Sequence, residues 1–214
     1  MTEHTELVLV RHGETEWNSH RRCQGHLDIP LSEQGMRQSR AVAQAVAGGH
    51  WAALYSSDLA RASMTAQAIA ETTGLPVRLD ERLRERALGI LQGLTHTEFR
   101  DRHPEDFAAF YGNDSDWVIP GGESQQQASD RMVGACQSIA NAHPGQRVLV
   151  VTHGGSIGCL MKWVMGLPAQ HARRWSIFNC ALHTFHVRGD DWRMVRWGET
   201  AHLNDHAAMD GVSL

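Results

Sequence analysis

Two short apolar runs, far apart in the chain, each end on a histidine followed by a glycine. Leu7–Val10 leads into Arg11-His12-Gly13, and Val148–Val151 leads into Thr152-His153-Gly154. Four apolar residues in a row, bounded by a polar turn, are typical of a strand buried on both faces of a sheet. In open α/β sheets, ligands bind at the carboxyl ends of the strands. If the two strands are parallel neighbours, the two histidines lie at one rim, where one could attack a substrate and the other assist.

A single histidine after a strand is usually a solvated loop residue or a cap. Two such sites, each followed by glycine and one preceded by Arg11, make coincidence the weaker explanation. The sequence therefore predicts a site of catalysis or ligand binding at this rim.

The length and composition favour one soluble domain. A chain of 214 residues is an ordinary size for a single α/β domain, and 42% hydrophobic with 21% charged residues is typical of a globular protein. No apolar run reaches the ~20 residues of a membrane helix. The first residues, Met-Thr-Glu-His-Thr-Glu, carry acids where a secretory signal would carry Lys or Arg. We expect a cytoplasmic protein.

Positive charge is carried almost entirely by arginine. The net charge is −4 and Lys162 is the sole lysine, so no polybasic stripe suggests binding to nucleic acid or membranes. The guanidinium fork suits phosphate oxygens, so the arginines near the rim matter individually. The four cysteines, Cys23, Cys136, Cys159 and Cys180, have no zinc-like spacing, and we expect reduced thiols and no metal.

Capping residues and apolar spacing predict several helices. Ser32 begins one whose buried stripe is Met36, Ala43, Val46 and Ala47. The Ser56-Ser57-Asp58 cluster is predicted to cap a helix over 59–73, with Arg61 in its first turn, where free N–H groups attract anions. An isolated arginine there is more often a surface residue. A further helix is expected over 156–165, a hairpin over 181–197, and solvated side chains at His202 and His206.

The segment Arg-His-Gly-Glu-Thr-Glu-Trp-Asn at 11–18 resembles the signature of the histidine phosphatase superfamily, which includes cofactor-dependent phosphoglycerate mutases and many phosphomonoesterases. From Leu7 to about Leu203 the chain follows that family's order of motifs. The resemblance implies one domain over 1–214, an α/β fold built as a three-layer α/β/α sandwich with a mostly parallel sheet, and a short helical cap inserted at about 94–120. It implies no cofactor, a small phosphorylated substrate, and a monomer or homodimer.

The same resemblance assigns roles to individual residues. His12 would be the nucleophile and Glu85 the proton donor. By its charge pattern alone, the segment from Glu81 to Arg86 would be a solvated turn. Asn18 would contact phosphate, with an Asx-turn or helix cap as an equal alternative, and Asn179 would lie near the site or in a turn. The other implied phosphate-binding or substrate-binding residues are Arg11, Arg61, His153, Gly154, Gln24, Gly25 and Arg86.

These residues predict a metal-independent phosphomonoesterase that works through phosphohistidine. A cofactor-dependent phosphoglycerate mutase is the alternative, but the glycolytic mutases carry Tyr where Leu88 stands and a longer insertion that holds more cations. Arg86, Arg100 and Arg102 could still recognise a second anionic group. A non-catalytic phosphate-binding module is a third hypothesis, and such a module would usually have lost His12, Glu85 or His153.

Overall fold

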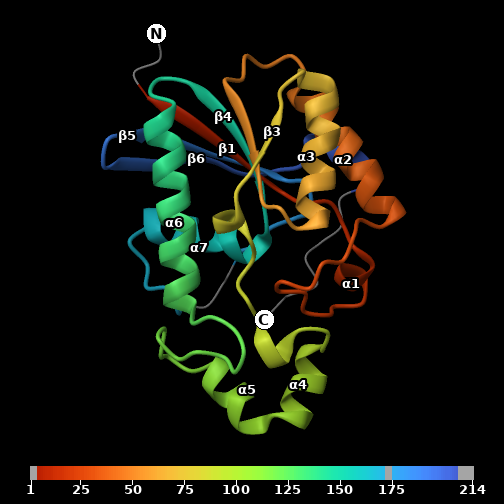
Figure 1. Ribbon diagram of the computed structural model, residues 1–214, viewed down its shortest axis with the longest axis vertical. Coiled ribbons are helices and arrows are strands. Elements are labelled where there is room, and N and C mark those ends of the chain that lie inside the picture. Colours follow the sequence, from red (N-terminus) through yellow and green to blue (C-terminus); the bar gives the residue numbers. More distant parts are fainter. Residues whose placement is uncertain (1–3, 172–174, 207–214) are drawn as a thin grey trace.

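The computed structural model describes residues 4–171 and 175–206, which form a six-stranded sheet with helices on both faces (Figure 1). The strand order is β3-β2-β4-β1-β5-β6. The first four strands of this order run parallel, and β5 and β6 are antiparallel additions at one edge. This confirms the predicted α/β fold with a mostly parallel sheet. The strands are β1 (Thr5–Arg11), β2 (Ala53–Ser56), β3 (Val77–Leu79), β4 (Arg147–Thr152), β5 (Leu182–Arg188) and β6 (Asp191–Glu199).

Strands β1 and β4 are direct parallel neighbours, as their matching apolar runs suggested. Arg11, the last residue of β1, pairs with Thr152, the last residue of β4. His12 and His153 directly follow these two residues. The His12 backbone N–H donates to the Thr152 carbonyl at 2.9 Å. The register therefore brings the two histidines to the same rim of the sheet.

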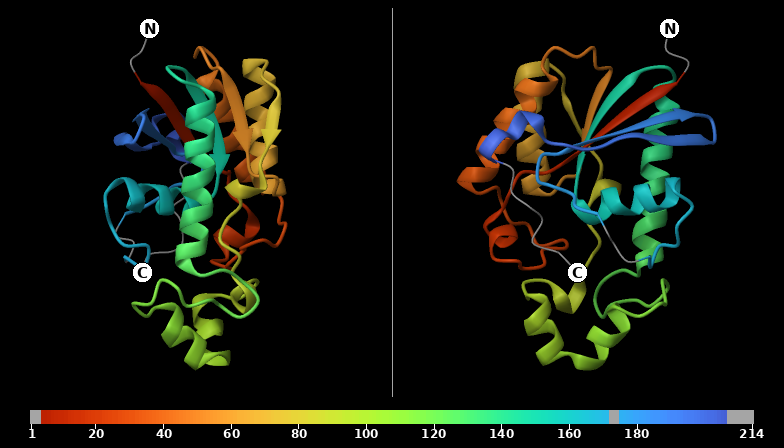
Figure 2. Two further views of the ribbon diagram at one scale, coloured as in Figure 1. Left: turned by 60° about the vertical axis from the view of Figure 1, so that its left-hand side comes forward. Right: turned by 180° about the vertical axis from the view of Figure 1, so that it is seen from behind.

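The apolar runs are continuous because each face of the sheet has its own core. Leu7 and Leu9 pack on one face with helices α6 (Gln125–Ala142) and α7 (Gly154–Val164). Val8 and Val10 pack on the other with α2 (Glu33–Val46) and α3 (Ala60–Thr73), and Figure 2 shows the two helical layers. Within the described ranges, no helix has the length and apolar character needed to cross a membrane.

Helix α2 begins after Ser32 as predicted, but its buried stripe is different. Met36 is exposed, and the buried residues are Gly35, Gln38, Ser39, Val42, Ala43 and Val46. The reason is close backbone packing: a Cβ built on Gly13 would lie 2.5 Å from the Gly35 carbonyl oxygen. At this end of the helix, small and polar residues face inward because the loop after β1 runs directly against it.

The predicted cap of α3 was wrong. The helix begins at Ala60, and its N-cap residue, Leu59, makes no side-chain capping bond. Asp28, from a distant loop, instead accepts a bond from the Ala60 N–H at 2.6 Å. Ser57 Oγ accepts from the Leu59 N–H at 3.3 Å, one residue before the helix begins, and it also binds His153. Asp58 binds Arg84.

Two smaller predictions also need correction. Helix α7 begins at Gly154, two residues before the predicted start. His202 is half-buried and bonds through Nε2 to the Cys180 carbonyl at 2.9 Å, so it is not a solvated tail residue. The side chain of His206 lies outside the described part of the structure.

The segment predicted as a cap stands apart from the sheet at one end of the molecule (Figures 1 and 2). It contains α4 (His96–Arg102), opened by a capping box of Thr95 and Glu98, and α5 (Pro104–Phe110). A small core of Leu91, Phe99 and Ile119 holds it together. The remaining elements are α1 (Glu16–Ser19) and three short 3₁₀ helices, Glu81–Leu83, Gly89–Leu91 and Ala201–His206.

Candidate active site

A cavity of about 340 Å³ opens where β1 and β4 end, with cap residues on one wall. Of the residues to which the family resemblance assigned a catalytic, phosphate-binding or substrate-binding role, all except His153 line it: Arg11, His12, Asn18, Gln24, Gly25, Arg61, Glu85, Arg86 and Gly154. His153 is fully buried beside His12, with 5.1 Å between the ring centroids. The structure therefore gathers residues from six separate stretches of the chain around one space.

His12 is held as a neutral imidazole with a defined tautomer. Its Nδ1 lies 2.7 Å from the Gly13 carbonyl oxygen, and because a carbonyl only accepts, Nδ1 must carry the proton. Burial, followed by the charges of Arg61 and Arg11, lowers the pKa of His12 well below its ordinary 6.5. The lone pair of Nε2 is therefore available for nucleophilic attack at neutral pH.

His153 is held in the opposite tautomer. Arg61 Nε donates to His153 Nδ1 at 3.2 Å, so the ring proton is on Nε2, which donates to Ser57 Oγ at 2.9 Å. Burial and the charge of Arg61 lower the pKa of His153 well below its ordinary value. Ser57 belongs to the cluster predicted to cap α3, and besides accepting from the Leu59 N–H at 3.3 Å it fixes the orientation of this histidine.

Arg61 supplies a buried positive charge. It lies in the first turn of α3 and donates to the carbonyls of Leu27 and Gly25 at 2.9 and 2.7 Å. These partners are neutral, and burial lowers the pKa of Arg61 to about 10. Arg11 is also buried and donates to the Ile177 carbonyl. Because the carbonyl groups that bind Arg61 are neutral, its positive charge is one that a phosphate group could offset.

Glu85 borders the same cavity. Its carboxylate accepts the Arg86 N–H at 2.9 Å and the Gly155 N–H, in the first turn of α7, at 2.8 Å. Its own carbonyl accepts from His26 Nε2 at 2.7 Å. The carboxyl group and the backbone of this residue are therefore both fixed, which suits a group that must deliver a proton to one atom.

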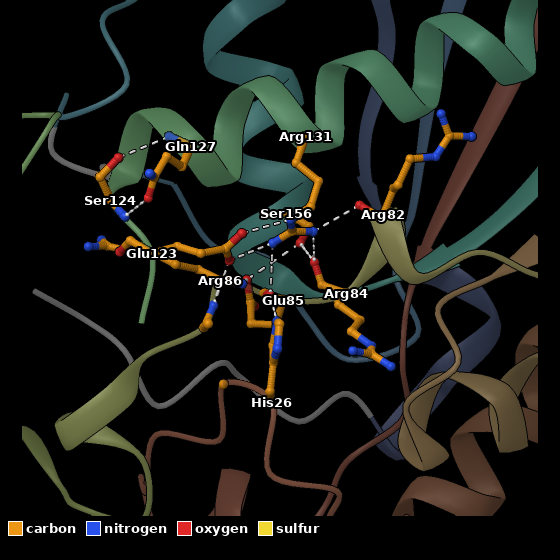
Figure 3. A network of polar contacts seen from close by, with 12 residues as sticks. His26, Arg82, Arg84, Glu85, Arg86, Glu123, Ser124, Gln127, Arg131 and Ser156 are labelled. Atoms are coloured by element: carbon orange, nitrogen blue, oxygen red, sulfur yellow. Dashed lines mark hydrogen bonds and ion pairs between the residues drawn. The ribbon is translucent and has the colours of Figure 1, made fainter. Parts of the chain in front are cut away.

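Arg131 of α6 holds the Glu85 segment in place (Figure 3). Its guanidinium donates to the carbonyls of Arg82 and Arg84, each at 2.9 Å, and of Glu85 at 3.1 Å. The same group binds both carboxylate oxygens of Glu123, at 2.9 and 2.7 Å. We call this arrangement the Arg131 clamp. Sequence reasoning missed it, because its partners are mainly backbone carbonyls.

Asn18, Asn179 and Gly25 differ in how they are placed relative to the cavity. Asn18 accepts from the Thr15 N–H at 3.0 Å and caps α1, as its alternative role predicted, while lining the cavity. Asn179 donates to the His12 carbonyl at 2.9 Å and does not line the cavity. Gly25 has a φ of +52°, and a Cβ there would lie 2.3 Å from Gln92 Oε1, so the position favours glycine.

Arg100 and Arg102 are exposed and do not line the cavity, so their suggested role in recognising an anion is not supported. The cavity is lined instead by residues that sequence reasoning missed: Trp17, Arg21, Arg22, His96, Phe110, Tyr111, Cys159, Lys162, Gln170 and His171. One signal could have found Lys162. Gly155, Cys159 and Lys162 have i, i+4, i+7 spacing, which places them on one face of α7.

No group of three or more His, Cys, Asp or Glu side chains suited to holding a metal ion occurs within the described residues.

Comparisons with known proteins agree with this fold. The model of the histidine phosphatase superfamily (branch 1) matches residues 7–200. Phosphoglycerate mutase-like protein 4 of Arabidopsis thaliana is 41% identical over 207 residues, covering 95% of this chain and 89% of that protein. A metal-independent phosphoserine phosphatase of the same plant is 39% identical over 206 residues, covering 95% and 85%.

Among solved structures, phosphoserine phosphatase of Entamoeba histolytica in complex with 3-phosphoglyceric acid is similar with a TM-score of 0.84 and 29% identity. The match covers 93% of this chain and 99% of that one. The resemblance at residues 11–18 thus extends over nearly the whole sequence and the whole fold. This chain belongs to the histidine phosphatase superfamily.

Proposed function

We propose that this protein is a metal-independent phosphomonoesterase that acts through a phosphohistidine on a small phosphorylated metabolite. One observation carries the proposal: His12 is neutral, with its proton on Nδ1, in a cavity that Arg11, Arg61 and Glu85 also line. Nucleophile, charge for the phosphate oxygens and a candidate proton donor therefore border one space.

In the first step, His12 Nε2 attacks phosphorus, an N–P bond forms, and the bond from phosphorus to the ester oxygen breaks. Glu85, protonated at this stage, gives its proton to the departing alkoxide. The positive charge that develops on the imidazole is stabilised at Nδ1–H by the Gly13 carbonyl. Arg11, Arg61 and the Gly154 N–H would bind the phosphoryl oxygens, whose charge they stabilise. His153, which accepts from Arg61 Nε, would position that guanidinium.

In the second step, water attacks the phosphohistidine. Glu85, now a carboxylate, takes a proton from that water, the N–P bond breaks, and its electron pair returns to His12 Nε2. Inorganic phosphate leaves, and Glu85 is again protonated for the next cycle. The same carboxyl group therefore acts as acid and then as base.

The side chains that the cap contributes to the cavity favour hydrolysis over mutase activity. His96, Phe110 and Tyr111 line the cavity from this segment, whereas Arg100 and Arg102 lie outside it. A mutase must shield phosphohistidine from water while its intermediate reorients, and it must hold that doubly charged intermediate. Supplied with 3-phosphoglycerate and 2,3-bisphosphoglycerate, the protein should release free phosphate faster than it forms 2-phosphoglycerate.

The nucleophile is tested by trapping. After brief incubation with a ³²P-labelled phosphomonoester and a denaturing quench, the protein should carry a label that is stable in alkali and lost in acid, as an N–P bond requires. His12→Ala should abolish the label, and His50→Ala, at an exposed position away from the cavity, should keep it. A label on Ser, Thr or Asp, or one that persists in His12→Ala, would contradict the proposal. Phosphate binding with no label would favour a non-catalytic module.

We further propose a cytoplasmic protein, monomeric or homodimeric, whose partner is a small phosphorylated molecule rather than nucleic acid or membrane. The cavity of about 340 Å³ supports a small ligand. Light scattering on the purified protein measures the oligomeric state.

A further inference from the structure

The backbone that carries His12 is fixed by both the sheet and helix α3. The His12 N–H donates to the Thr152 carbonyl at 2.9 Å, and the His12 carbonyl accepts from Asn179 Nδ2 at 2.9 Å. The next N–H, that of Gly13, donates to Thr65 Oγ1 of α3 at 3.0 Å. Both polar groups of the peptide between His12 and Gly13 are therefore bound, which defines the orientation of this peptide.

The following peptide, between Gly13 and Glu14, connects the His12 ring to helix α2. Its carbonyl, on Gly13, accepts the Nδ1 proton of His12 at 2.7 Å, and its N–H, on Glu14, donates to Gln38 Oε1 at 2.8 Å. The Glu14 carbonyl accepts from the Ser32 N–H at 2.9 Å. Gln38 therefore binds the opposite end of the peptide that orients the nucleophile.

Close packing explains how Gln38 reaches this peptide. Gln38 is completely buried on α2, one turn after Gly35. A Cβ built on Gly35 would lie 2.0 Å from the Glu14 carbonyl oxygen, so the loop lies directly on the helix backbone. Val42 and Val46 are buried on the same helix, and a buried amide is costly unless it is hydrogen-bonded. A glutamine at this position therefore calls for a function beyond filling the core.

The two hydrogen bonds of this peptide strengthen each other. Donation of the N–H to Gln38 polarises the peptide and increases the negative charge on the Gly13 carbonyl oxygen. The bond from the ring to that oxygen raises the pKa of His12, whereas burial and then the charges of Arg61 and Arg11 lower it. When Nε2 attacks phosphorus, the ring becomes positive. A more negative acceptor at Nδ1 then stabilises the phosphohistidine more than the free imidazole.

We propose that Gln38 is a positioning residue for the nucleophile: through the Glu14 N–H it orients and polarises the Gly13 carbonyl, which keeps the His12 proton on Nδ1. The proposal rests on the proposed function and adds to it a residue that does not line the cavity. Without the acceptor on Gln38, the Glu14 N–H loses its partner and the carbonyl binds the ring less firmly. The proton of His12 then also occupies Nε2, which blocks the attack.

The test compares two replacements of Gln38. Gln38→Met has a similar length and no oxygen, whereas Gln38→Glu keeps an oxygen that accepts in either protonation state. Both lose the amide donor Nε2, so the pair differs in the acceptor. Release of 4-nitrophenolate from 4-nitrophenyl phosphate in a single turnover, with enzyme in saturating excess, measures the first step alone.

In this assay Gln38→Met should be slower than the wild type by about 10- to 100-fold, because the attacking atom is misplaced. The enzyme concentration that gives the half-maximal rate should change by less than about 3-fold, since the groups that bind phosphate are untouched. Gln38→Glu should recover most of the rate. Gln44→Met, at an exposed glutamine of the same helix, is the matched control and should keep the wild-type rate.

A second measurement does not depend on turnover. In protein with ¹⁵N-labelled histidine, long-range ¹H–¹⁵N correlation spectra show which ring nitrogen carries the proton, and His12→Ala identifies the His12 signals. The wild type, Gln38→Glu and Gln44→Met should show the proton on Nδ1, and Gln38→Met should show a mixture of both tautomers. Gln38→Asn, whose oxygen is one methylene further from the Glu14 N–H, carries the same expectation as Gln38→Met and replaces it if that protein does not fold.

A Gln38→Met protein with the wild-type rate and tautomer would overturn the proposal. It would also be overturned by a Gln38→Glu protein as slow as Gln38→Met, by a slow Gln38→Met protein with an unchanged tautomer, or by an equal loss in Gln44→Met. The spectra separate this proposal from the proposed function. If the tautomer changes as expected and no phosphomonoester is hydrolysed, the proposed function alone fails; if wild type and Gln38→Met hydrolyse equally well, the role of Gln38 alone fails.

Discussion

Lowering the pH from 7 to 5 should destabilise this protein through three buried histidines. His12, His153 and His183 are all nearly inaccessible to water. Burial is the largest cause that lowers each pKa, well below 6.5 for His12 and His153 and to about 3 for His183. In the unfolded chain the same rings bind protons near pH 6.5.

The sign and size of the effect follow from linkage. Stability falls with falling pH wherever the unfolded state binds more protons than the folded state, which holds here below pH 6.5. Between pH 7 and pH 5 each such histidine costs about 2 kcal/mol, so the three together cost about 6 kcal/mol of unfolding free energy. That is a large part of the roughly 5–15 kcal/mol typical of a folded domain.

The carboxylates change the stability of the protein in a lower pH range than the histidines do. Glu6, Asp58 and Glu123 have lowered pKa values, and their side-chain hydrogen bonds with arginine are the main lowering cause. The stability they contribute is present above the unfolded-state pKa of about 4–4.5 and is lost below it. The interval from pH 7 to pH 5 therefore isolates the histidines.

The assay is urea unfolding followed by tryptophan fluorescence at half-unit steps of pH, with unfolding free energies obtained by linear extrapolation. His183→Gln should remove about a third of the pH-dependent loss, whereas His50→Gln, at an exposed ring, should remove none of it. A free energy that changes by less than about 1 kcal/mol between pH 7 and pH 5 would refute the reasoning, because one buried neutral histidine already exceeds that value.

Other perturbations test the catalytic groups and their supports. Glu85→Gln should lower kcat/KM by about 100-fold or more on an alkyl phosphate and by under about 10-fold on 4-nitrophenyl phosphate, whose phenolate leaves without a proton; equal losses would indicate a structural role. Arg131→Met removes the Arg131 clamp and leaves Glu123 partly buried without its partner, so urea unfolding should show a loss of about 2–3 kcal/mol, and a loss below about 1 kcal/mol would contradict this. Excess EDTA should leave hydrolysis unchanged, and activity that EDTA removes and a divalent ion restores would disprove metal independence.

The sequence predicted the two strands that carry His12 and His153 well because their signal is local. A strand buried on both faces must be continuously apolar, so the two runs before His12 and His153 identify adjacent strands of the sheet core. Capping boxes at Thr95 and Ser124 were also predictable, since both partners lie within four residues of each other.

Tertiary contacts account for what sequence reasoning missed. The Arg131 clamp binds backbone carbonyls, which every residue has, so no residue type marks its partners. Asp28 caps a helix that begins 32 residues later in the chain. Met36 faces outward because glycine and serine occupy the side of α2 that meets the loop after β1. Each of these depends on which segments meet in the folded chain.

The pairing of Arg11 with Thr152 has a consequence for how this scaffold can be altered. Deleting one residue from β1 or β4 would turn the following histidine to the opposite face of the sheet, so neither strand tolerates a change of length. The cap is under no such restriction, because it forms no strand of the sheet and has a small core of its own. Grafting a cap from a relative should therefore exchange selectivity while the reacting groups stay in place, whereas an insertion beside either histidine should inactivate the enzyme.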